Sequence, residues 1–336
     1  MNTLILNENQ IETAADIIKN GGLVAFPTET VYGLGADALN GKAVAGIFAA
    51  KGRPMDNPLI VHISELSQLD GLVSEIPENA RKLADAFWPG PLTMIMKKTS
   101  AVPFEVSAGL DTVAIRFPSN RTAQRLITLS GTPIAAPSAN LSGRPSPTTY
   151  KHVEHDMYGR IDAIIAGESC DVGLESTVIT LALDTPRLLR PGGITLEQLE
   201  AVIGHVDVDK AVFSKPDDNE RVASPGMKYK HYAPRAKVII INGSSDEYAA
   251  YIAKNADKHP YALCYDEDAG KLNVPYITYG GQFDYAQQAQ KLFDALRELD
   301  EIGADLVYAR CPKPDGVGMA VYNRLIRAAG FEVIDL

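Results

Sequence analysis

Apolar positions in the first 200 residues follow helical spacing in some stretches and form short buried runs in others. Residues 10–20 repeat apolar side chains every three or four positions, which predicts an amphipathic helix ended by Gly21 and Gly22. Further helices are predicted over 77–87, 121–129 and 195–203, and over 40–50 with Asn40 as N-cap. Apolar runs predict strands at 23–26, 59–63, 92–96, 112–117, 133–137 and 161–166, with two more around 178 and 188. Interleaved helices and strands of this kind predict an α/β fold.

Strands and helices alternate regularly from residue 237 onward. Strands are predicted at 238–241, 260–265, 275–279, 305–309 and 331–334, separated by helices at 246–256, 285–302 and 319–329. This alternation is typical of a parallel, Rossmann-like sheet with helices on both faces. A charged stretch poor in apolar residues, 215–221, precedes it. We therefore predict an N-terminal domain over 1–210, a linker over 211–236 and a C-terminal domain over 237–336.

Composition places the chain among ordinary globular proteins. Its 336 residues are 46% hydrophobic and 22% charged. The three cysteines lack C-x-x-C spacing, which fits a reducing compartment and predicts a cytoplasmic protein. We expect no signal peptide, membrane span or metal cage, and a monomer, because two domains already bury surface against each other.

The charge balance limits the ligands that the chain can bind. A formal net charge of −10 argues against general binding of nucleic acids, so an anionic ligand needs a local cluster of cations. Residues 224–237 carry four Lys/Arg and no acid. This basic segment is either a solvated linker or a flap that covers an anionic ligand.

A second basic stretch lies at 51–59, where two cations flank a glycine. The prolines that follow Arg53 and Asn57 favour extended conformations at both residues. In an extended chain, Lys51 and Arg53 point the same way and reach one polyanion together. The alternative is a solvated loop.

Polar residues recur where the predicted strands end, which is where ligand sites gather in α/β proteins. They are Thr30, Arg53, Arg116, Ser138, Ser176 and Arg190. Other motifs are unconvincing. Residues 35–43 have the wrong spacing for a P-loop, and 33–38 match a dinucleotide fingerprint only loosely and are interpreted as a tight turn. His152, His155 and Asp156 are expected to form a solvated helix face rather than a metal site.

Five motifs, in order and spacing, resemble those of the YrdC-type threonylcarbamoyl-AMP synthase family. They are Pro27-Thr28-Glu29-Thr30-Val31-Tyr32-Gly33-Leu34, Lys51-Gly52-Arg53-Pro54 with Asn57-Pro58-Leu59, Pro137-Ser138-Ala139-Asn140, Glu175-Ser176-Thr177-Val178 and Arg190-Pro191-Gly192. The segment 224–234 and the C-terminal domain resemble the long, two-domain form. The resemblance implies an N-terminal twisted mixed sheet with helices around a central cavity.

The same resemblance implies a nucleotidyltransferase that joins L-threonine, bicarbonate and ATP into threonylcarbamoyl-AMP and pyrophosphate. A downstream transferase would then modify adenosine 37 of tRNA. Mg²⁺ would enter with ATP. Two other readings stay open, an RNA-binding, translation-associated module of the same fold and a transferase that uses carbamoyl phosphate.

By similarity, the family's functional residues fall on positions that keep its residue types. The catalytic cluster would be Lys51, Arg53, Ser138 and Asn140. ATP would be contacted by Arg53, Asn57, Thr112, Ala136, Ser138, Ser146, Arg190 and Ser224. Threonine would be held by Thr30, His62, Arg116 and Ser176. Nucleotidyl transfer needs positioned cations and donors more than a strong base, which these side chains supply.

Overall fold

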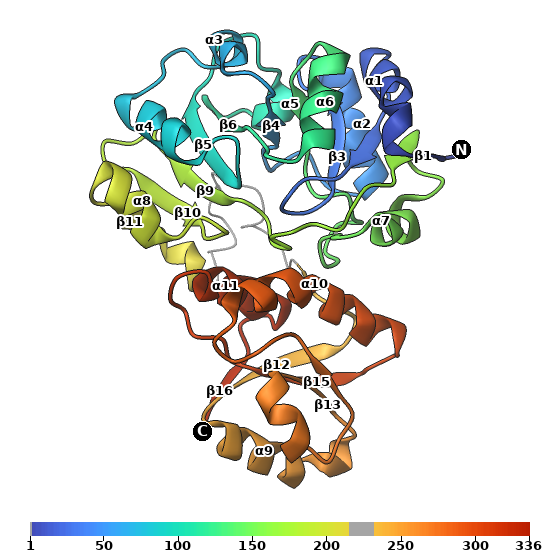
Figure 1. The fold of residues 1–336 in the computed structure, drawn as a ribbon, viewed down its shortest axis with the longest axis vertical. Coiled ribbons are helices and arrows are strands. Elements are labelled where there is room, and N and C mark those ends of the chain that lie inside the picture. Colours follow the sequence, from blue (N-terminus) through green and yellow to red (C-terminus); the bar gives the residue numbers. More distant parts are fainter. Residues whose placement is uncertain (1, 215–231) are drawn as a thin grey trace.

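The chain forms two domains stacked along the long axis of the molecule (Figure 1). The structure is a computed structural model, and it describes residues 2–214 and 232–336. The last strand of the first sheet ends at Val208, and the first strand of the second sheet begins at Lys237. Most of the predicted linker, 215–231, lies outside the described residues.

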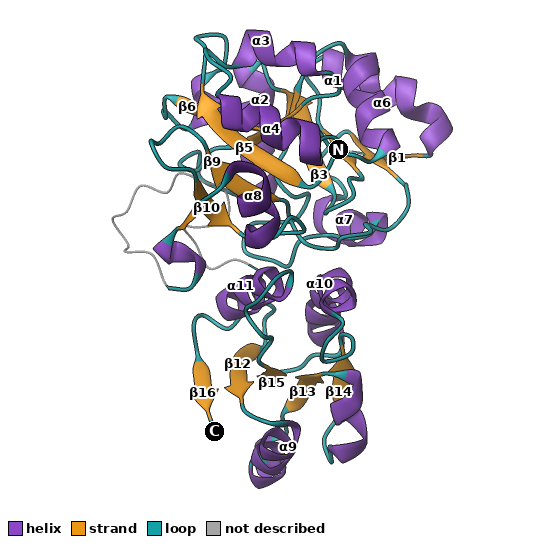
Figure 2. Ribbon diagram, turned by 60° about the vertical axis from the view of Figure 1, so that its left-hand side comes forward, coloured by secondary structure: helices purple, strands orange, loops and turns teal. Residues whose placement is uncertain are grey.

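The N-terminal domain is built on an eleven-stranded mixed sheet (Figure 2). Its strands are β1 (Leu4–Leu6), β2 (Val24–Phe26), β3 (Gly33–Asp37), β4 (Ile60–His62), β5 (Leu92–Lys97), β6 (Thr112–Arg116), β7 (Ile134–Ala135), β8 (Ala163–Ile165), β9 (Thr177–Thr180), β10 (Arg187–Arg190) and β11 (Asp207–Val208). Their order in the sheet is β1-β8-β2-β3-β7-β4-β6-β5-β9-β10-β11. The sheet contains both parallel and antiparallel pairs, so the predicted mixed sheet is confirmed.

Helices pack against this sheet through apolar faces. They are α1 (Ile11–Lys19), α2 (Gly41–Lys51), α3 (Leu69–Leu72), α4 (Glu78–Phe87), α5 (Phe104–Ser107), α6 (Arg121–Ser130), α7 (Tyr150–Met157) and α8 (Leu196–Ile203). The apolar repeat that predicts α1 is its buried face. The Asn40 side chain accepts a hydrogen bond from the Ala43 amide and so caps α2, as predicted.

The interpretation of residues 33–38 as a tight turn is wrong. Residues 33–37 form β3, which pairs antiparallel with β2 and β7. A Cβ atom on Gly35 would lie 2.8 Å from both the Phe26 ring and Ile134, so a larger residue would push them apart. The glycine is needed here for close packing and not for a phosphate contact.

The C-terminal domain is a five-stranded sheet in the order β14-β13-β15-β12-β16. Its strands are β12 (Lys237–Asn242), β13 (Tyr261–Cys264), β14 (Tyr276–Thr278), β15 (Leu306–Arg310) and β16 (Val333–Asp335). All neighbouring pairs are parallel, which confirms the predicted Rossmann-like arrangement. Helices α10 (Tyr285–Glu301) and α11 (Gly318–Ala328) cover the face toward the N-terminal domain, and α9 (Ser245–Lys254) covers the other (Figures 1 and 2).

Polar contacts join α11 to the end of the N-terminal domain. The Asn323 amide donates to the Val212 carbonyl at 2.7 Å, and Arg327 donates to the Ala211 carbonyl at 2.6 Å. Asn323 and Arg327 are both buried. Within the part of the chain that the structure describes, no helix is long and apolar enough to cross a bilayer.

Candidate active site

A deep cavity lies in the N-terminal domain, where several strands end. The space between its walls is about 680 Å³ when the adjoining open solvent is counted with it. Strands β4 and β6 run parallel, with His62 beside Arg116 at their carboxyl ends, and Arg190 ends β10. The cavity is lined by Thr28, Thr30, Val31, Gly33, Arg53, Leu59, Ile60, His62, Arg116, Ala136, Pro137, Ser138, Asn140, Arg144, Ser146, Glu175, Ser176, Arg190 and Tyr232.

The lining is cationic although the chain is acidic. Among the described residues it holds four arginines and a single carboxylate, Glu175. Burial lowers the pKa of Arg190 to about 10, which still leaves the guanidinium charged at neutral pH. A cavity of this kind attracts an anion with several charged groups.

One wall is organised around Arg116, which is 3% exposed. Its Nη1 donates to the Thr30 hydroxyl at 2.8 Å, and its Nη2 lies 2.8 Å from a carboxylate oxygen of Glu29. Its Nε has no hydrogen-bond partner among the described residues. A buried polar atom without a partner at a cavity wall is suited to meet a ligand.

His62 stands beside Arg116 and is also buried. Burial, reinforced by the Arg116 guanidinium, lowers the pKa of His62 to about 3. The imidazole is therefore neutral at pH 7. Its Nδ1 has no hydrogen-bond partner in the described part of the chain, so the ring offers the cavity an uncharged polar group.

The part of the wall beside Arg116 carries hydroxyls held in fixed positions, since Thr93 is the register partner of Arg116 on the neighbouring strand. Ser176 and Thr93 share a hydrogen bond of 2.7 Å. Arg190 donates from Nε to the Ser176 carbonyl at 3.0 Å and from Nη2 to the Ser176 hydroxyl at 3.2 Å. Ser176 and Arg190 are thereby fixed relative to each other.

Lys51 is the last residue of α2 and does not line the cavity. Its Nζ donates to the Ser138 carbonyl at 2.5 Å and the Asn140 carbonyl at 2.6 Å, behind the cavity wall. The prediction that Lys51 and Arg53 lie in an extended segment and point the same way is wrong. Helix α2 continues through Lys51, and Gly52 then adopts φ 63, which turns the chain before Arg53.

Arg53 reaches the cavity by itself, and one of its nitrogens donates to the Asn57 carbonyl at 3.0 Å. Burial, with the charge of Arg53 nearby, lowers the pKa of Lys51 to about 7. The two cations are thus close enough for their charges to interact, although they do not lie side by side on one strand.

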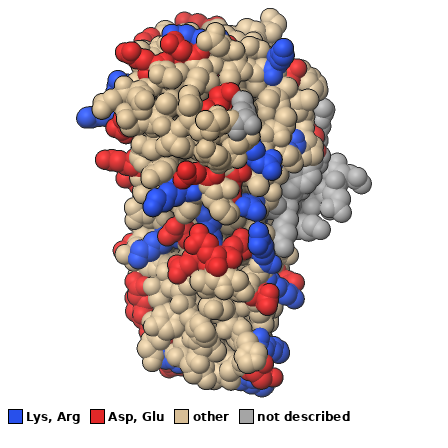
Figure 3. Space-filling view, turned by 90° about the vertical axis from the view of Figure 1, so that its right-hand side faces the viewer, with Lys and Arg blue, Asp and Glu red and all other residues tan. Residues whose placement is uncertain are grey.

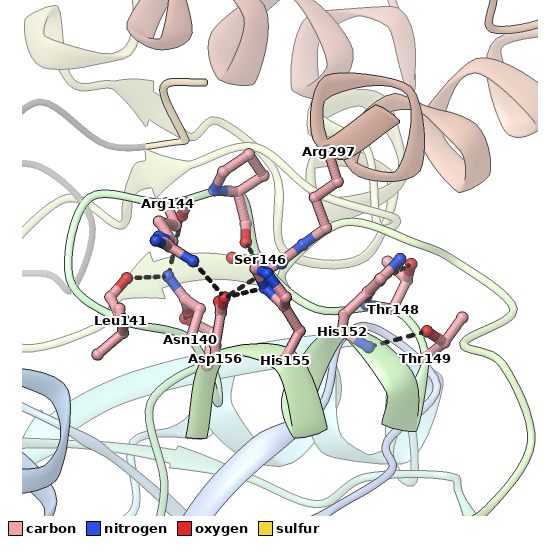
Figure 4. A network of polar contacts seen from close by, with 12 residues as sticks. Asn140, Leu141, Arg144, Ser146, Thr148, Thr149, His152, His155, Asp156 and Arg297 are labelled. Atoms are coloured by element: carbon pink, nitrogen blue, oxygen red, sulfur yellow. Dashed lines mark hydrogen bonds and ion pairs between the residues drawn. The ribbon is translucent and has the colours of Figure 1, made fainter. Parts of the chain in front are cut away.

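The loop after β7 forms another wall (Figure 4). The Ser138 hydroxyl donates to Asn140 Oδ1 at 2.5 Å, and Asn140 Nδ2 donates to the carbonyls of Leu141 and Arg144 at 2.8 and 2.9 Å. Arg144 Nη1 in turn lies 2.8 Å from Asp156. The prediction that His152, His155 and Asp156 form a solvated helix face holds for His155. It is wrong for Asp156, whose side chain is fully buried, and for His152, which is 13% exposed and lies 3.2 Å from Asp294 of the C-terminal domain.

Glu175 connects this wall to the C-terminal domain. Its Oε1 accepts from the Ser146 hydroxyl at 2.5 Å, and its Oε2 accepts from Arg324 Nε on α11 at 2.7 Å. Burial alone would raise the pKa of Glu175, but the Arg324 and Arg190 guanidinium groups reverse this and hold it below its usual value. Glu175 is therefore ionised, and each of its carboxylate oxygens accepts a hydrogen bond.

The cavity gathers most of the residues predicted for a site. Ten of them line it: Thr30, Arg53, His62, Arg116, Ala136, Ser138, Asn140, Ser146, Ser176 and Arg190. Lys51 lies just behind the wall, and Asn57 and Thr112 are outside the lining. Ser224 and most of the predicted flap lie outside the described residues.

Nine lining residues were not predicted as site residues. They are Thr28, Val31, Gly33, Leu59, Ile60, Pro137, Arg144, Glu175 and Tyr232. Thr28, Val31 and Glu175 stand inside motifs that already pointed to the site, so proximity in sequence was a usable signal. The positions of Arg144 and Tyr232 depend on long-range contacts that local sequence patterns do not predict. Arg144 pairs with Asp156, and Tyr232 packs in the core of the C-terminal domain.

Comparison with known proteins extends over both domains. Residues 16–192 match the Sua5, YciO and YrdC family model described as "Telomere recombination". Residues 194–330 match the model described as "Threonylcarbamoyl-AMP synthase, C-terminal domain". Together the two models span the cavity and the domain that contacts it.

Individual relatives agree with the family models. Threonylcarbamoyl-AMP synthase of Pyrococcus abyssi is 47% identical over 99% of both chains. The protein of that name from Bacillus subtilis is 49% identical over 98% of this chain and 96% of its own. The crystal structure of P. abyssi Sua5 complexed with L-threonine superposes with a TM-score of 0.92 at 46% identity, covering 99% of this chain and 100% of the other. The chain therefore belongs to the threonylcarbamoyl-AMP synthase family, in its two-domain form.

Proposed function

We propose that this protein is an L-threonylcarbamoyladenylate synthase, which makes threonylcarbamoyl-AMP and pyrophosphate from L-threonine, bicarbonate or CO2, and ATP. The observation that carries the proposal is the cavity, where four arginines surround hydroxyls and a neutral imidazole. It offers a cationic part for phosphates and a smaller polar part for an amino acid. A relative of nearly the same fold has been crystallised with L-threonine.

The threonine half lies around Arg116. The Arg116 guanidinium binds the threonine carboxylate, with Thr30 and Ser176 holding the rest of the amino acid by their hydroxyls. Neutral His62 accepts or donates a hydrogen bond without adding charge. The threonine amine loses a proton and adds to the carbon of CO2, which gives a carbamate anion within reach of the nucleotide.

The ATP half lies around Arg53, Ser138, Asn140, Ser146 and Arg190. A carbamate oxygen attacks the α-phosphorus, the bond from that phosphorus to the bridging oxygen breaks, and pyrophosphate leaves. Arg53 and Arg190 stabilise the negative charge that develops, while Lys51 adds a charge from behind the loop. Ala136 leaves space for the adenine base, and the contacts of Asn57, Thr112 and Ser224 with the nucleotide stay predictions.

Magnesium enters with ATP and is held by the phosphates. Among the described residues the cavity offers only the Glu175 carboxylate, and its two oxygens already bind Ser146 and Arg324.

The product is a mixed anhydride and therefore chemically unstable. A transferase that moves its threonylcarbamoyl group to adenosine 37 of tRNA is the proposed partner. A monomeric state and a cytoplasmic location stay predictions.

Pyrophosphate release is the test of this function. ATP is incubated with threonine, with serine or with no amino acid, each with and without bicarbonate. We expect pyrophosphate only when threonine and bicarbonate are both present, and much less with serine, which lacks the methyl group. Pyrophosphate release that does not depend on threonine or on bicarbonate contradicts the synthase, and so does the absence of any release. RNA binding would then be measured next.

The pH dependence of ATP use should report the protonation of Lys51. Because the pKa of Lys51 is about 7, the ammonium is charged below that pH and neutral above it. We expect kcat/KM for ATP to fall as the pH rises through 7 to 9, by up to about tenfold per unit, because the loop behind the phosphates loses its cation.

Lys51→Met supplies the reference for this titration. The substrates titrate identically with both enzymes, so the ratio of wild-type to variant kcat/KM isolates the lysine. A ratio that stays constant between pH 6 and 9 contradicts the assignment of Lys51 as a titrating cation.

A further inference from the structure

We propose that the C-terminal domain shapes the nucleotide half of the cavity through two buried arginines, Arg297 on α10 and Arg324 on α11. Both are positioning residues, because each binds a carboxylate of the N-terminal domain that holds a part of the cavity wall. The inference rests on the proposed function and gives the second domain a task within it.

Arg297 fixes the loop that carries Arg144. Its Nη2 donates to the Pro145 carbonyl at 2.5 Å and lies 2.8 Å from Asp156 Oδ2. The other oxygen of Asp156 accepts from Arg144 Nη1 at 2.8 Å. Asp156 thus lies between an arginine of the C-terminal domain and an arginine of the cavity wall, as Figure 4 shows.

The effect of Arg297 extends along the loop to the predicted catalytic cluster. Asn140 Nδ2 donates to the Arg144 carbonyl at 2.9 Å, and Asn140 Oδ1 accepts from the Ser138 hydroxyl. A shift of the backbone at Arg144 and Pro145 therefore displaces the groups that face the phosphates. Displacements of about 1 Å at such groups cost roughly 100-fold in rate.

Arg324 fixes a second part of the wall in the same manner. It is 0% exposed, and it binds Glu175 both through the carboxylate, at 2.7 Å, and through the carbonyl, at 3.3 Å. Glu175 holds the Ser146 hydroxyl with its other oxygen. The Arg324 guanidinium also lies 5.7 Å from the ring centre of Tyr232, another lining residue.

Elsewhere along the domain seam, the described ion pair between His152 and Asp294 involves no residue that lines the cavity. Figure 3 shows acidic and basic side chains mixed on both sides of the seam. A groove near α7 and α10 is lined by Arg144, Pro145, Lys151, His152 and His155 on one side and Asp294, Arg297, Glu298, Asp300 and Glu301 on the other. Arg144 lines both this groove and the cavity. Arg297 and Arg324 differ because their partners are buried and lead to residues that line the cavity.

The test replaces each arginine in the full-length protein by lysine, which keeps the charge but loses the planar set of donors. We expect Arg297→Lys and Arg324→Lys to raise KM for ATP about tenfold or more, while the Kd of L-threonine in Arg297→Lys stays within twofold of wild type. Asp156→Asn removes the carboxylate that pairs with Arg297, and it should raise KM for ATP as the Arg297 variant does. The matched control is Arg310→Lys, because Arg310 makes an equally buried ion pair with Asp268 inside the C-terminal domain.

Binding of a non-hydrolysable ATP analogue, followed by calorimetry, keeps this test separate from the proposed reaction. Affinity lost in the two interface variants and kept in Arg310→Lys supports the proposal even if no pyrophosphate is formed. Affinity within twofold of wild type in both interface variants overturns it, and so does a loss of equal size in Arg310→Lys. The proposed function itself is tested separately, by the dependence of wild-type pyrophosphate release on threonine and bicarbonate.

Discussion

Arg116→Leu should lower the affinity for L-threonine by about 100-fold or more and reduce turnover in step. The guanidinium is the buried cation beside Thr30 and His62, and its Nε faces no other acceptor among the described residues. Charge-assisted hydrogen bonds to a carboxylate contribute roughly 1.5–3 kcal/mol each, and two of them account for a loss of this size. Calorimetric titration with L-threonine in the absence of ATP measures it.

The stability of Arg116→Leu needs its own control. Leucine leaves the Glu29 carboxylate buried without its cation, which costs about 3–5 kcal/mol of folding free energy. The double variant Glu29→Gln/Arg116→Leu removes that charge and should regain most of the stability without regaining threonine affinity. Threonine binding within twofold of wild type in the double variant contradicts the assignment of Arg116 to the substrate carboxylate.

Lys51→Met should reduce kcat by roughly 100-fold or more and leave the fold intact. The ammonium group binds the carbonyls of Ser138 and Asn140, so its loss releases the loop and removes a cation from behind the phosphates. Burial opposes the charged form of this lysine, as the lowered pKa shows, and methionine fills a similar volume without that cost. We therefore expect a melting temperature close to that of wild type.

Lys98→Met is the matched control for this substitution. Lys98 is half-buried and also donates to a backbone carbonyl, that of Val102, but it does not line the cavity. It should lose little activity. Equal activity of Lys51→Met and Lys98→Met in the pyrophosphate assay contradicts a role for Lys51 in catalysis.

Local patterns predicted the elements whose partners are near in sequence. The apolar repeat of α1 and the Asn40 cap of α2 are properties of single turns of helix, and both are confirmed. The regular alternation after residue 237 predicted a parallel sheet, because parallel strands need crossover helices. The five motifs also pointed to one cavity, and each contributes at least one lining residue, although Arg53 follows a helix and Ser176 precedes β9 rather than ending a strand.

The errors arose where long-range packing decided the conformation. The turn at 33–38 became a strand because Phe26 and Ile134 close around Gly35 from both neighbouring strands. The direction of Lys51 was mistaken because helix α2 runs one residue further than predicted and Gly52 then turns the chain. Asp156 was expected in water because its partners are not its neighbours in sequence. Arg144 is 12 residues away, and Arg297 is 141 residues away in the other domain.

The position of β15 in the C-terminal sheet limits the order in which the protein can fold during its synthesis. This strand lies in the centre of the sheet, between β12 and β13, yet the ribosome makes it after β12, β13 and β14. Until β15 emerges, the facing edges of β12 and β13 stay unpaired and available to other chains. Helix α11, which carries Arg324, is made later still. The cavity wall is therefore completed only after α11 has been made, so chaperones that bind unpaired sheet edges should matter most for this protein during synthesis of its second domain.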